Sequence, residues 1–345
     1  MIFRTFKLVL LALLLVAPGL AQATDTTPVK LIVGAFASPG SPWDKDWQTF
    51  RRNLDEAAGD RVALKLLIRG ETGGEPVTMT AIRRNRIQFG GFTLGGASAI
   101  VPELSVLLSP FFFADTDELD YVMDRHMLDV FQPLFAEKNL VLLRWVEVGW
   151  LNMYGKKPIL LPEDAQGYRL RAQASEASQI MMESLGGDMI QMKFQDVIPS
   201  LQTGLIAGGD TNVVIYGLTG LAEEAPHLTL TRHAYDTGVV VANLDWFDGL
   251  PPELRRIVDA AFPASADARA GVRAVAAAIT ERAKAAGFNF HEISAEDRAR
   301  WATVTEDNYR RIIAEIGGAS QMVYDAMLAG RGEYRARKRG RGADG

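Results

Sequence analysis

Residues 162–172 read PEDAQGYRLRA, and this stretch predicts a turn that leads into a β-strand. PEDAQG consists of turn and helix-cap residue types, whereas YRLRA alternates apolar and basic side chains with the two-residue period of a strand. Arg169 and Arg171 therefore share one face of the expected strand. A lone arginine on a strand face usually points into solvent. A guanidinium also suits a desolvated carboxylate, because its planar donors match the two carboxylate oxygens.

A second unit follows at residues 192–212, MKFQDVIPSLQTGLIAGGDTN. Its pattern predicts a short helix that ends at Gly204 and then a glycine-rich turn. The turn carries Asp210 and Thr211 into a loop, so both are candidate binding residues, with Tyr216 just beyond them. Together with the strand around Arg171, this unit predicts a second α/β lobe.

The first half of the chain alternates between strand and helix patterns. The spacing is that of right-handed crossovers, which predicts a parallel sheet. A strand then returns at 237–243, and residues 250–327 show helical patterns. The elements expected in the first half are strands 29–36, 62–68, 87–93 and 140–148, helices 43–58 and 118–138, and a loop at 69–76 that feeds a further helix.

Two α/β lobes joined by more than one crossover predict a cleft between them. Ligands of open α/β sheets bind beyond the carboxyl ends of the strands. Strand ends and loops of the first lobe therefore supply further candidate binding residues, namely Phe36, Trp43, Glu71 and Thr93. The alternative for each of them is a role in loop structure or in the core.

The N-terminus has the three parts of a secretory signal peptide. Arg4 and Lys7 precede an apolar run at 8–17, and small residues for cleavage stand at 21–23. We expect cleavage after residue 23 and a periplasmic location, because no other stretch approaches the roughly 18–20 apolar residues of a membrane span. Without residues 1–23 the chain has 35 basic and 42 acidic residues, a net charge of −7. Nucleic acid is not expected as a partner of such a chain.

The C-terminal residues 331–345 have a different charge balance from the rest of the chain. Like-charge runs at a terminus are usually solvated, so a disordered basic tail is predicted. Weak docking to a membrane surface or a partner is the alternative. The basic residues are Arg331, Arg335, Arg337, Lys338, Arg339 and Arg341, against Glu333 and Asp344.

Several classes of chemistry lack their residues in this sequence. The absence of cysteine excludes disulfides, thiol catalysis and iron–sulfur clusters. The four histidines form no His-Glu-x-x-His pair, and there is no nucleophile elbow, Walker loop or dinucleotide-binding glycine motif. We therefore expect a protein that is not an enzyme and needs no cofactor, and keep a cofactor-free periplasmic enzyme as the least favoured alternative.

Four blocks of residues stand in an order and spacing that together form a specific pattern. They are Ser109-Pro110-Phe111-Phe112-Phe113, then Lys157-Pro158-Ile159 with PEDAQGYRLR at 162–171, then Leu201-Gln202-Thr203-Gly204 with its glycine-rich sequel, and EAPHLTLTRH at 224–233. In these blocks the chain resembles the substrate-binding proteins of TRAP transporters, the tripartite ATP-independent periplasmic uptake systems. The resemblance extends over nearly all of the mature sequence.

The resemblance implies an α/β fold, a two-lobed periplasmic binding-protein clamshell with a ligand cleft between the lobes and a helical C-terminal region. We place lobe I at 24–148 and 237–277 and lobe II at 149–236 and 278–330, with closure about the strands near Val148 and Asp236. The family implies a monomer that binds a small organic anion and delivers it to a TRAP membrane permease. A module that reports the ligand to a membrane sensor is the second interpretation.

The resemblance also implies roles for single residues. Arg171 matches the carboxylate clamp, and Phe194 matches an aromatic residue that packs on the ligand. Leu151 stands where many members have a second arginine, and Thr211 stands where an asparagine often contacts the carboxylate.

These departures change the expected ligand, because the cleft has one positive charge fewer. Trp150 and Glu147 suggest a larger or partly aromatic ligand with a hydroxyl or amine that donates to Glu147. Core packing is the alternative for Trp150. A metal ion takes part in binding in some members, and Glu147 or Asp210 could hold one here, although nothing in the spacing requires it.

Overall fold

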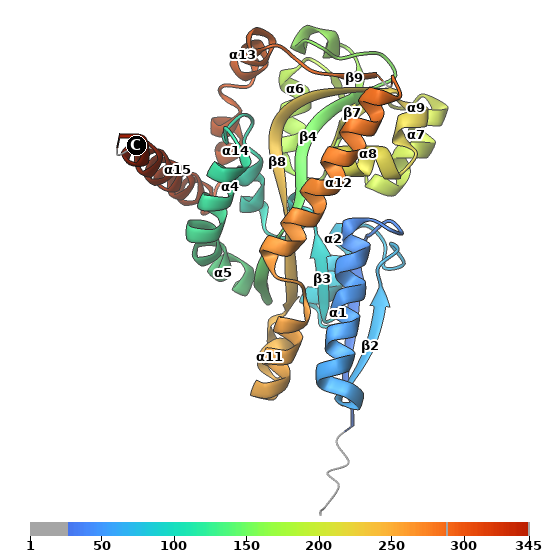
Figure 1. Cartoon of the computed structure of the whole chain (residues 1–345), viewed down its shortest axis with the longest axis vertical. Helices are drawn as coiled ribbons and strands as arrows, with labels where there is room; N and C mark the ends of the chain where they lie inside the picture. Colours follow the sequence, from blue (N-terminus) through green and yellow to red (C-terminus); the bar gives the residue numbers. More distant parts are fainter. Residues whose placement is uncertain (1–26, 288, 344–345) are drawn as a thin grey trace, which may run out of the picture.

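The computed structural model describes residues 27–287 and 289–343, so the predicted signal peptide at 1–23 lies outside the described residues. In this part of the chain one mixed sheet has the order β2-β1-β3-β8-β4-β7-β5-β6, and β9 pairs with β8 (Figure 1). The strands are β1 (Val29–Ala35), β2 (Val62–Leu67), β3 (Phe89–Phe92), β4 (Leu140–Gly155), β5 (Arg169–Ala172), β6 (Asp188–Gln191), β7 (Gly208–Thr211), β8 (His227–Asn243) and β9 (Asn289–His291). The α-helices are α1 (Pro42–Ala58), α2 (Glu75–Arg83), α3 (Leu94–Ala97), α4 (Thr116–Val122), α5 (Leu128–Ala136), α6 (Glu176–Ser184), α7 (Val197–Thr203), α8 (Val213–Leu218), α9 (Leu221–Glu224), α10 (Leu244–Asp248), α11 (Pro252–Ala261), α12 (Ser265–Ala285), α13 (Ala295–Val304), α14 (Asn308–Ile316) and α15 (Ser320–Ala343).

Helix α1 shows how local sequence builds one wall of the later cleft. The Ser41 side chain caps the helix by accepting the Asp44 backbone N–H at 3.2 Å, and Pro42 occupies the first turn. Trp47, Phe50, Leu54 and Ala58 recur at helical spacing and are all buried. The apolar face holds α1 against the sheet, so that Trp43 stands at the end facing the second lobe.

The direction of the strands only partly matches the predicted parallel sheet. Strands β1, β2 and β3 are parallel neighbours, and so are β5, β6 and β7. Strand β4 was expected to continue the first set, and it does run in the same direction as β1, β2 and β3, but it pairs with none of them. The returning strand β8 lies antiparallel between β3 and β4, and β4 also pairs antiparallel with β7.

The long strands β4 and β8 run through both halves of the molecule (Figure 1). Strand β8 meets β3 at Val239–Ala242, whereas the other end of β4 meets β7. Their register shifts between Glu147 and Gly149, where Gly149 has a φ of 120° that favours glycine. The lobe boundaries predicted at 148/149 and 236/237 fall at this shift, and the residue bounds of the lobes stay a prediction.

Helix α12 departs from the predicted boundary at 277/278, because it is one continuous helix that extends along both halves (Figure 1). Near its start, Arg269 and Arg273 pair with Asp120 of α4 at 3.7 and 2.7 Å. Near its end, Ile279 packs closely against Gly217 of α8. The helix therefore links elements of both predicted lobes.

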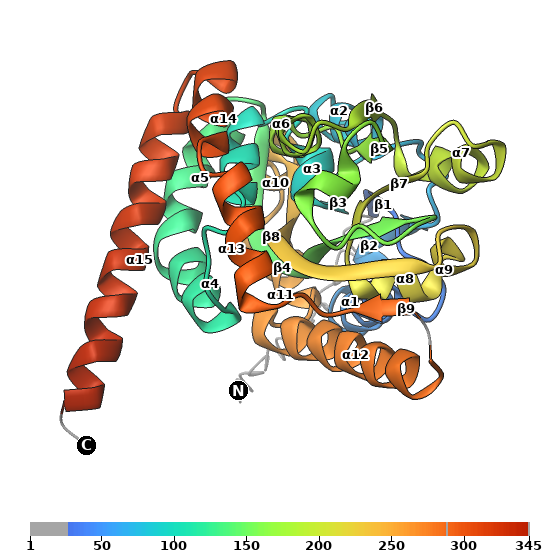
Figure 2. The same cartoon turned by 90° about the horizontal axis from the view of Figure 1, so that it is seen from above.

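The basic C-terminal segment is helical through residue 343, whereas the charge run predicted a disordered tail. Helix α15 lies along one side of the molecule beside α4 (Figure 2). The Arg335 Nε donates to the buried Glu118 carboxylate at 2.6 Å, and Arg331 donates to the Phe112 carbonyl at 3.1 Å. Val323 and Met327 of the same helix pack in one buried cluster with Leu119 and Val122 of α4, whereas the prediction placed residues 320–330 in lobe II. The pairing of Arg335 with Glu118 of α4 thus keeps on the protein a basic side chain that would otherwise be solvated.

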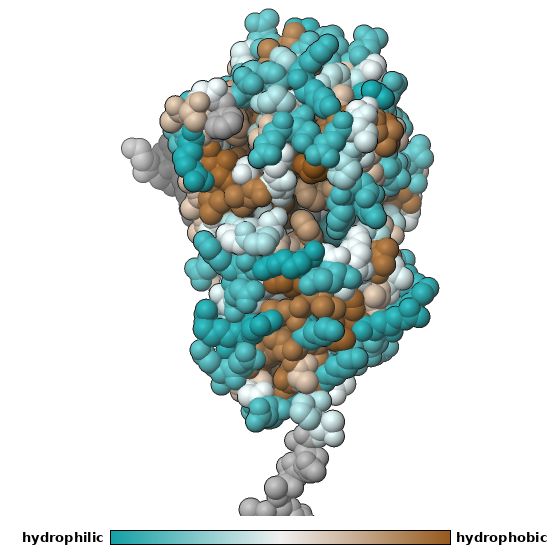
Figure 3. Space-filling view, turned by 90° about the vertical axis from the view of Figure 1, so that its right-hand side faces the viewer, coloured by the Kyte–Doolittle hydropathy of each residue, from teal (hydrophilic) through white to brown (hydrophobic). Residues whose placement is uncertain are grey.

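The face shown in Figure 3 is mostly polar, with apolar side chains gathered over one half and in smaller groups over the other. Strand β2 forms one edge of the sheet, and its residues Val62, Leu64 and Leu66 are half-buried. None of the helices in the described part of the chain combines the length and apolar character needed to cross a membrane.

Candidate ligand-binding site

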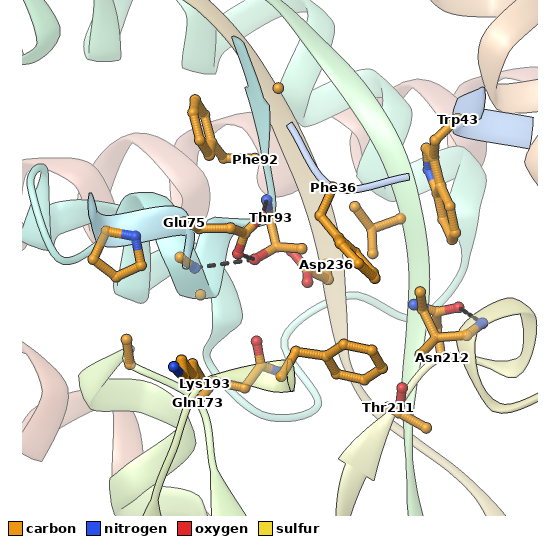
Figure 4. Close-up of a pocket in the computed structure, with 18 of the residues that line it drawn as sticks. Phe36, Trp43, Glu75, Phe92, Thr93, Gln173, Lys193, Thr211, Asn212 and Asp236 are labelled. Carbon is orange, nitrogen blue, oxygen red and sulfur yellow. Dashed lines mark hydrogen bonds between the residues drawn. The ribbon is translucent and has the colours of Figure 1, made fainter. Parts of the chain in front are cut away.

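A cavity of about 380 Å³ lies between the two halves of the molecule (Figure 4). Its walls come from the ends of β1 and β3 and the starts of α1 and α2 on one side, and from β5, β7 and the segment 191–195 on the other. The lining combines aromatic residues with charged ones. The charged residues are Asp46, Glu75, Arg171, Lys193, Asp210 and Asp236, and the aromatic ones are Phe36, Trp43, Trp47, Phe92, Phe194 and Phe262.

Arg171 is held in the cavity wall by β5, between β6 and β7. Its side chain is only 8% exposed, and its Nε donates to the Met192 carbonyl at 3.4 Å. Among the described residues no carboxylate lies within 4.0 Å of the guanidinium, and its terminal nitrogens have no hydrogen-bond partner. A buried cation without a counterion is costly, so this arrangement favours an anionic ligand.

Gly209 makes room for Arg171, because it faces Arg171 across the β5–β7 pair. A Cβ atom at Gly209 would lie 2.9 Å from the Tyr154 hydroxyl oxygen and 3.1 Å from the Arg171 Cβ. The buried Tyr154 hydroxyl has no hydrogen-bond partner in the described residues. The glycine thus lets β4, β5 and β7 approach closely behind the guanidinium.

Glu75 and Asp236 form an acidic wall on the side of α2 and β8 (Figure 4). The Glu75 carboxylate accepts the Thr93 backbone N–H at 2.8 Å and the Thr93 hydroxyl at 2.7 Å. Asp236 is 2% exposed, and its Oδ1 accepts the Leu94 N–H at 2.9 Å. Burial raises the pKa of Glu75 and raises that of Asp236 to about 7, while Arg171 opposes both shifts.

Two further acidic residues line the cavity in different settings. Asp210 lies 3.5 Å from the Gln173 amide nitrogen in the cavity wall and 3.5 Å from the His233 Nε2 behind it. Asp46 on α1 has no such partner, and burial raises its pKa to about 6. In the described part of the chain, no three histidine or acidic side chains are arranged to hold a metal ion.

Contacts between the lobes close the mouth of the cavity. The rings of Phe36 and Phe194 meet with centroids 5.7 Å apart. The Trp43 indole donates to the Glu147 carbonyl at 2.8 Å and so joins α1 to the crossing strand β4. Within lobe I a Cβ at Gly96 would lie 2.0 Å from the Glu75 Oε2, and across the cleft a Cβ at Gly95 would lie 2.2 Å from the Gln173 Oε1, so only glycines fit at both positions. The structure thus describes a closed cleft.

Seven of the residues proposed from the sequence lie together around the cavity, and four do not. Those that line it are Arg171, Phe194, Asp210, Thr211, Thr93, Phe36 and Trp43. Trp150 packs edge-on against Tyr235, and the exposed Glu71 accepts the Arg69 N–H. Tyr216 is buried, and its hydroxyl donates to the Ala225 carbonyl at 2.8 Å.

Glu147, the fourth, faces away from the cavity and does not need a ligand donor. Its buried carboxylate accepts the Arg273 Nε at 2.9 Å, and Arg273 also forms a two-point pair with Asp120. The suggestion of a ligand amine or hydroxyl at Glu147 is therefore corrected. The reason is the alternation of side chains along β4, because Val146 and Val148 line the cavity and Glu147 between them points to the other face.

The sequence analysis missed Glu75, Gln173 and Asp236, which line the cavity. Glu75 stands in the predicted loop at 69–76, next to Pro76, and the first turn of a helix at a strand end is a usual place for a binding residue. Asp236 stands at the predicted closure point of the lobes. Both positions therefore carry a sequence signal that points to a binding residue.

Asp236→Asn is expected to raise the melting temperature more at pH 8 than at pH 5. With a pKa of about 7 in the folded state, against 3.8 ordinarily, Asp236 keeps a proton that the unfolded chain has lost. The stability that this group contributes is therefore full at low pH and is lost as pH rises toward and through 7. Thermal melts at both pH values test this, with the exposed Asp60→Asn as control. An equal shift at both pH values would contradict it.

Two α/β lobes that enclose a cavity and are joined by crossing strands define the class of clamshell solute receptors. The comparison with known families agrees. The chain belongs to the bacterial extracellular solute-binding proteins of family 7, DctP, whose model matches residues 33–316.

Relatives and solved structures cover most of the chain. The C4-dicarboxylate-binding periplasmic protein DctP of Rhodobacter capsulatus is 24% identical over 92% of this chain and 95% of its own length. A solute-binding protein of Chromohalobacter salexigens is 27% identical over 84% and 87%. A TRAP periplasmic solute-binding protein from Roseobacter denitrificans, solved with bound β-D-glucuronate, is 25% identical with a TM-score of 0.81 over 87% of this chain and 99% of that one.

Proposed function

We propose that this protein is a periplasmic receptor that binds a small organic acid through Arg171. The observation that carries the proposal is a buried guanidinium that faces a closed cavity without a counterion in the described residues. A carboxylate would supply that counterion, and its two oxygens match the free terminal nitrogens. The protein would act by binding alone.

The similar proteins support an organic acid as the ligand. The Roseobacter denitrificans protein was solved with glucuronate, a similar one from Sulfitobacter with β-D-galacturonate, and the Rhodobacter capsulatus protein is named for C4-dicarboxylates. These ligands share a carboxylate and differ in the rest of the molecule. The rest of the ligand depends on the lining of this cavity, so the proposal takes over only the carboxylate.

Delivery to a TRAP membrane permease is the second part of the proposal. Ligand binding would favour the closed arrangement, in which contacts such as Phe36 with Phe194 join the lobes, and the permease would recognise that closed surface. Uptake of a labelled ligand by cells that hold the permease, with and without the receptor, tests delivery. Binding without receptor-dependent uptake would favour the sensor interpretation.

A thermal-shift screen of residues 24–345 against several hundred small acids tests the binding proposal. A ligand that binds only the folded state raises the melting temperature by mass action, by several degrees at high saturation. Hits are then measured by calorimetry. A screen in which neutral compounds bind and acids do not would refute the acid receptor.

Phe194→Ala is expected to increase the dissociation rate of the acid about tenfold and to change the association rate little. The ring pairs with Phe36 across the mouth of the cavity, and such a pair is worth about 0.5–1.5 kcal/mol. Substitutions at a binding contact change mainly the dissociation rate. Stopped-flow fluorescence measures both rates, and Phe194→Leu, which keeps apolar bulk, should have a smaller effect. An unchanged dissociation rate would show that this contact does not retain the ligand.

A further inference from the structure

The charge of the cavity does not match a simple acid. Its lining contains Asp46, Glu75, Asp210 and Asp236 but only Arg171 and Lys193 as permanent cations. The Lys193 side chain is 56% exposed and lies 3.7 Å from Asp196, so its charge is directed to the rim. Inside the cavity one guanidinium therefore faces several acids, and a bound monoanion would add to the negative charge.

Arg171 and two of the acids occupy opposite walls, whereas Asp210 of β7 stands on the same wall as Arg171. Arg171 comes from β5, whereas Glu75 and Asp236 come from α2 and β8, and neither acid lies within 4.0 Å of the guanidinium. Figure 4 shows Glu75, Thr93 and Asp236 together, across the cavity from Gln173 and Lys193. The cavity thus has a positive and a negative pole.

Asp236 is an acceptor without a full set of partners. Asp236 lines the cavity and is only 2% exposed. Its Oδ1 accepts the Leu94 N–H, whereas its Oδ2 has no hydrogen-bond partner among the described residues. Glu75 is fixed by its two bonds from Thr93, which favour the ionised form against burial. A buried acceptor of this kind calls for a donor from the ligand.

Aromatic rings stand next to the negative pole. Phe36, Phe92 and Trp43 line the cavity on the side of lobe I, and Phe194 reaches Phe36 from lobe II. Aromatic faces combined with carboxylates bind organic cations well, whereas a polyhydroxylated ligand uses an even mixture of donors and acceptors. This lining favours a charged nitrogen over a hydroxyl as the donor.

We propose that the ligand is an amphoteric acid, with a carboxylate on Arg171 and a protonated nitrogen between Glu75 and Asp236. The inference rests on the proposed function, because it keeps Arg171 as the carboxylate anchor. Such a ligand would connect the two lobes through its two ends. Each end would gain its partner only when the cleft is closed, which couples ligand charge to closure.

Matched probes test the proposal in the full mature chain. Calorimetry would compare 3- and 4-aminocyclohexanecarboxylate with the corresponding hydroxy acids and with cyclohexanecarboxylate, which share one ring and one carboxylate. We expect an amino acid of this set to bind at least about tenfold more tightly than its hydroxy partner, since a hydrogen bond to a charged group is worth about 1.5–3 kcal/mol.

Two variants assign the preference to the acidic wall. Glu75→Gln should lower the affinity of the amino probe relative to its hydroxy partner about tenfold or more. Asp236→Asn should act in the same direction and serves as the second variant if Glu75→Gln is unstable. Glu281→Gln, whose side chain is 76% exposed on α12, is the charge-matched control and should change nothing.

Proton exchange gives an independent readout. Titrations in buffers of different ionisation enthalpy should show proton release when the amino probe binds near Asp236, and proton uptake when the unsubstituted acid binds. The groups that face Asp236 are Glu75, Asp210 and Arg171. Release by both kinds of probe, or by neither, would contradict the placement of the nitrogen.

The outcomes separate the inference from the function on which it rests. Acids that bind through Arg171 with no preference for the amino probe would overturn the inference and leave the receptor standing. Binding that disappears with a chelator would overturn it in favour of a metal ion at the acidic wall. If no probe bound, or if Arg171→Met bound them all as well as the natural chain, the receptor proposal and the inference would both fail.

Discussion

Replacement of Arg171 by methionine is expected to raise the dissociation constant for the bound acid about a hundredfold or more. The guanidinium is 8% exposed and has no carboxylate within 4.0 Å in the described part of the chain, so its charge is available to the ligand. Loss of one partner from a buried, charge-assisted pair costs about 2–5 kcal/mol. Methionine keeps the apolar length of the stem and removes only the charged group.

The chain offers a matched control two residues away. Arg169 lies on the same strand and on the same face but is exposed, so Arg169→Met should leave the affinity within about twofold. Arg171→Lys keeps the charge without the two-point geometry and should give an intermediate loss. Calorimetry and far-ultraviolet circular dichroism, applied to all three variants, separate loss of binding from loss of folding. Equal affinities for Arg169→Met and Arg171→Met would show that the anchor lies elsewhere.

Arg273→Met is expected to lower the free energy of unfolding by about 3 kcal/mol. Arg273 donates to the Glu147 carboxylate at 2.9 Å and to both oxygens of Asp120, and Glu147 is only 2% exposed. Removal of the cation leaves a buried carboxylate without its partner, which costs about 3–5 kcal/mol in proteins. Because Arg273 itself is about one-third exposed, the lower end of this range applies.

Urea unfolding monitored by tryptophan fluorescence measures this loss. Arg282→Met on the same helix, α12, is the control, because Arg282 is exposed and bonds only to the Ala278 carbonyl. The double variant Glu147→Gln/Arg273→Met should recover part of the stability, since a neutral amide is less costly to bury than an unpaired carboxylate. A single variant as stable as the double one would mean that Glu147 tolerates the loss of its cation.

The sequence predicted most of the elements because their signals are local. The cap and the apolar spacing of α1 predict that helix at 43–58, and it spans Pro42–Ala58. The pairing of β4 with β8 depends on which strand inserts between which others, and residues about a hundred positions apart decide it. No local pattern contains that information. The predicted parallel sheet therefore failed where β8 lies antiparallel between β3 and β4, while the individual strands were found.

The candidate site was predictable to the extent that strand ends and loops gather at one edge of a sheet. This rule brought Thr93, Phe36 and Asp210 to the cavity together with Arg171. It failed for Glu147, because the neighbouring Val146 and Val148 face the cavity and Glu147 points to the other face, where Arg273 of a helix 126 positions away meets it. Glu75 was overlooked because a carboxylate in a polar loop looks solvated until Gly96 and Thr93 pack against it.

The unbroken course of β4, β8 and α12 has a consequence for engineering the specificity of this scaffold. A recombinant protein that took one lobe from a relative would have junctions inside two hydrogen-bonded strands and one helix. Chimeras should therefore be joined in exposed turns such as 156–158 or 286–287. By the same reasoning, a single lobe expressed alone would expose the edges of β4 and β8 and be prone to aggregate, so ligand preference is better altered by point substitutions in the cavity wall.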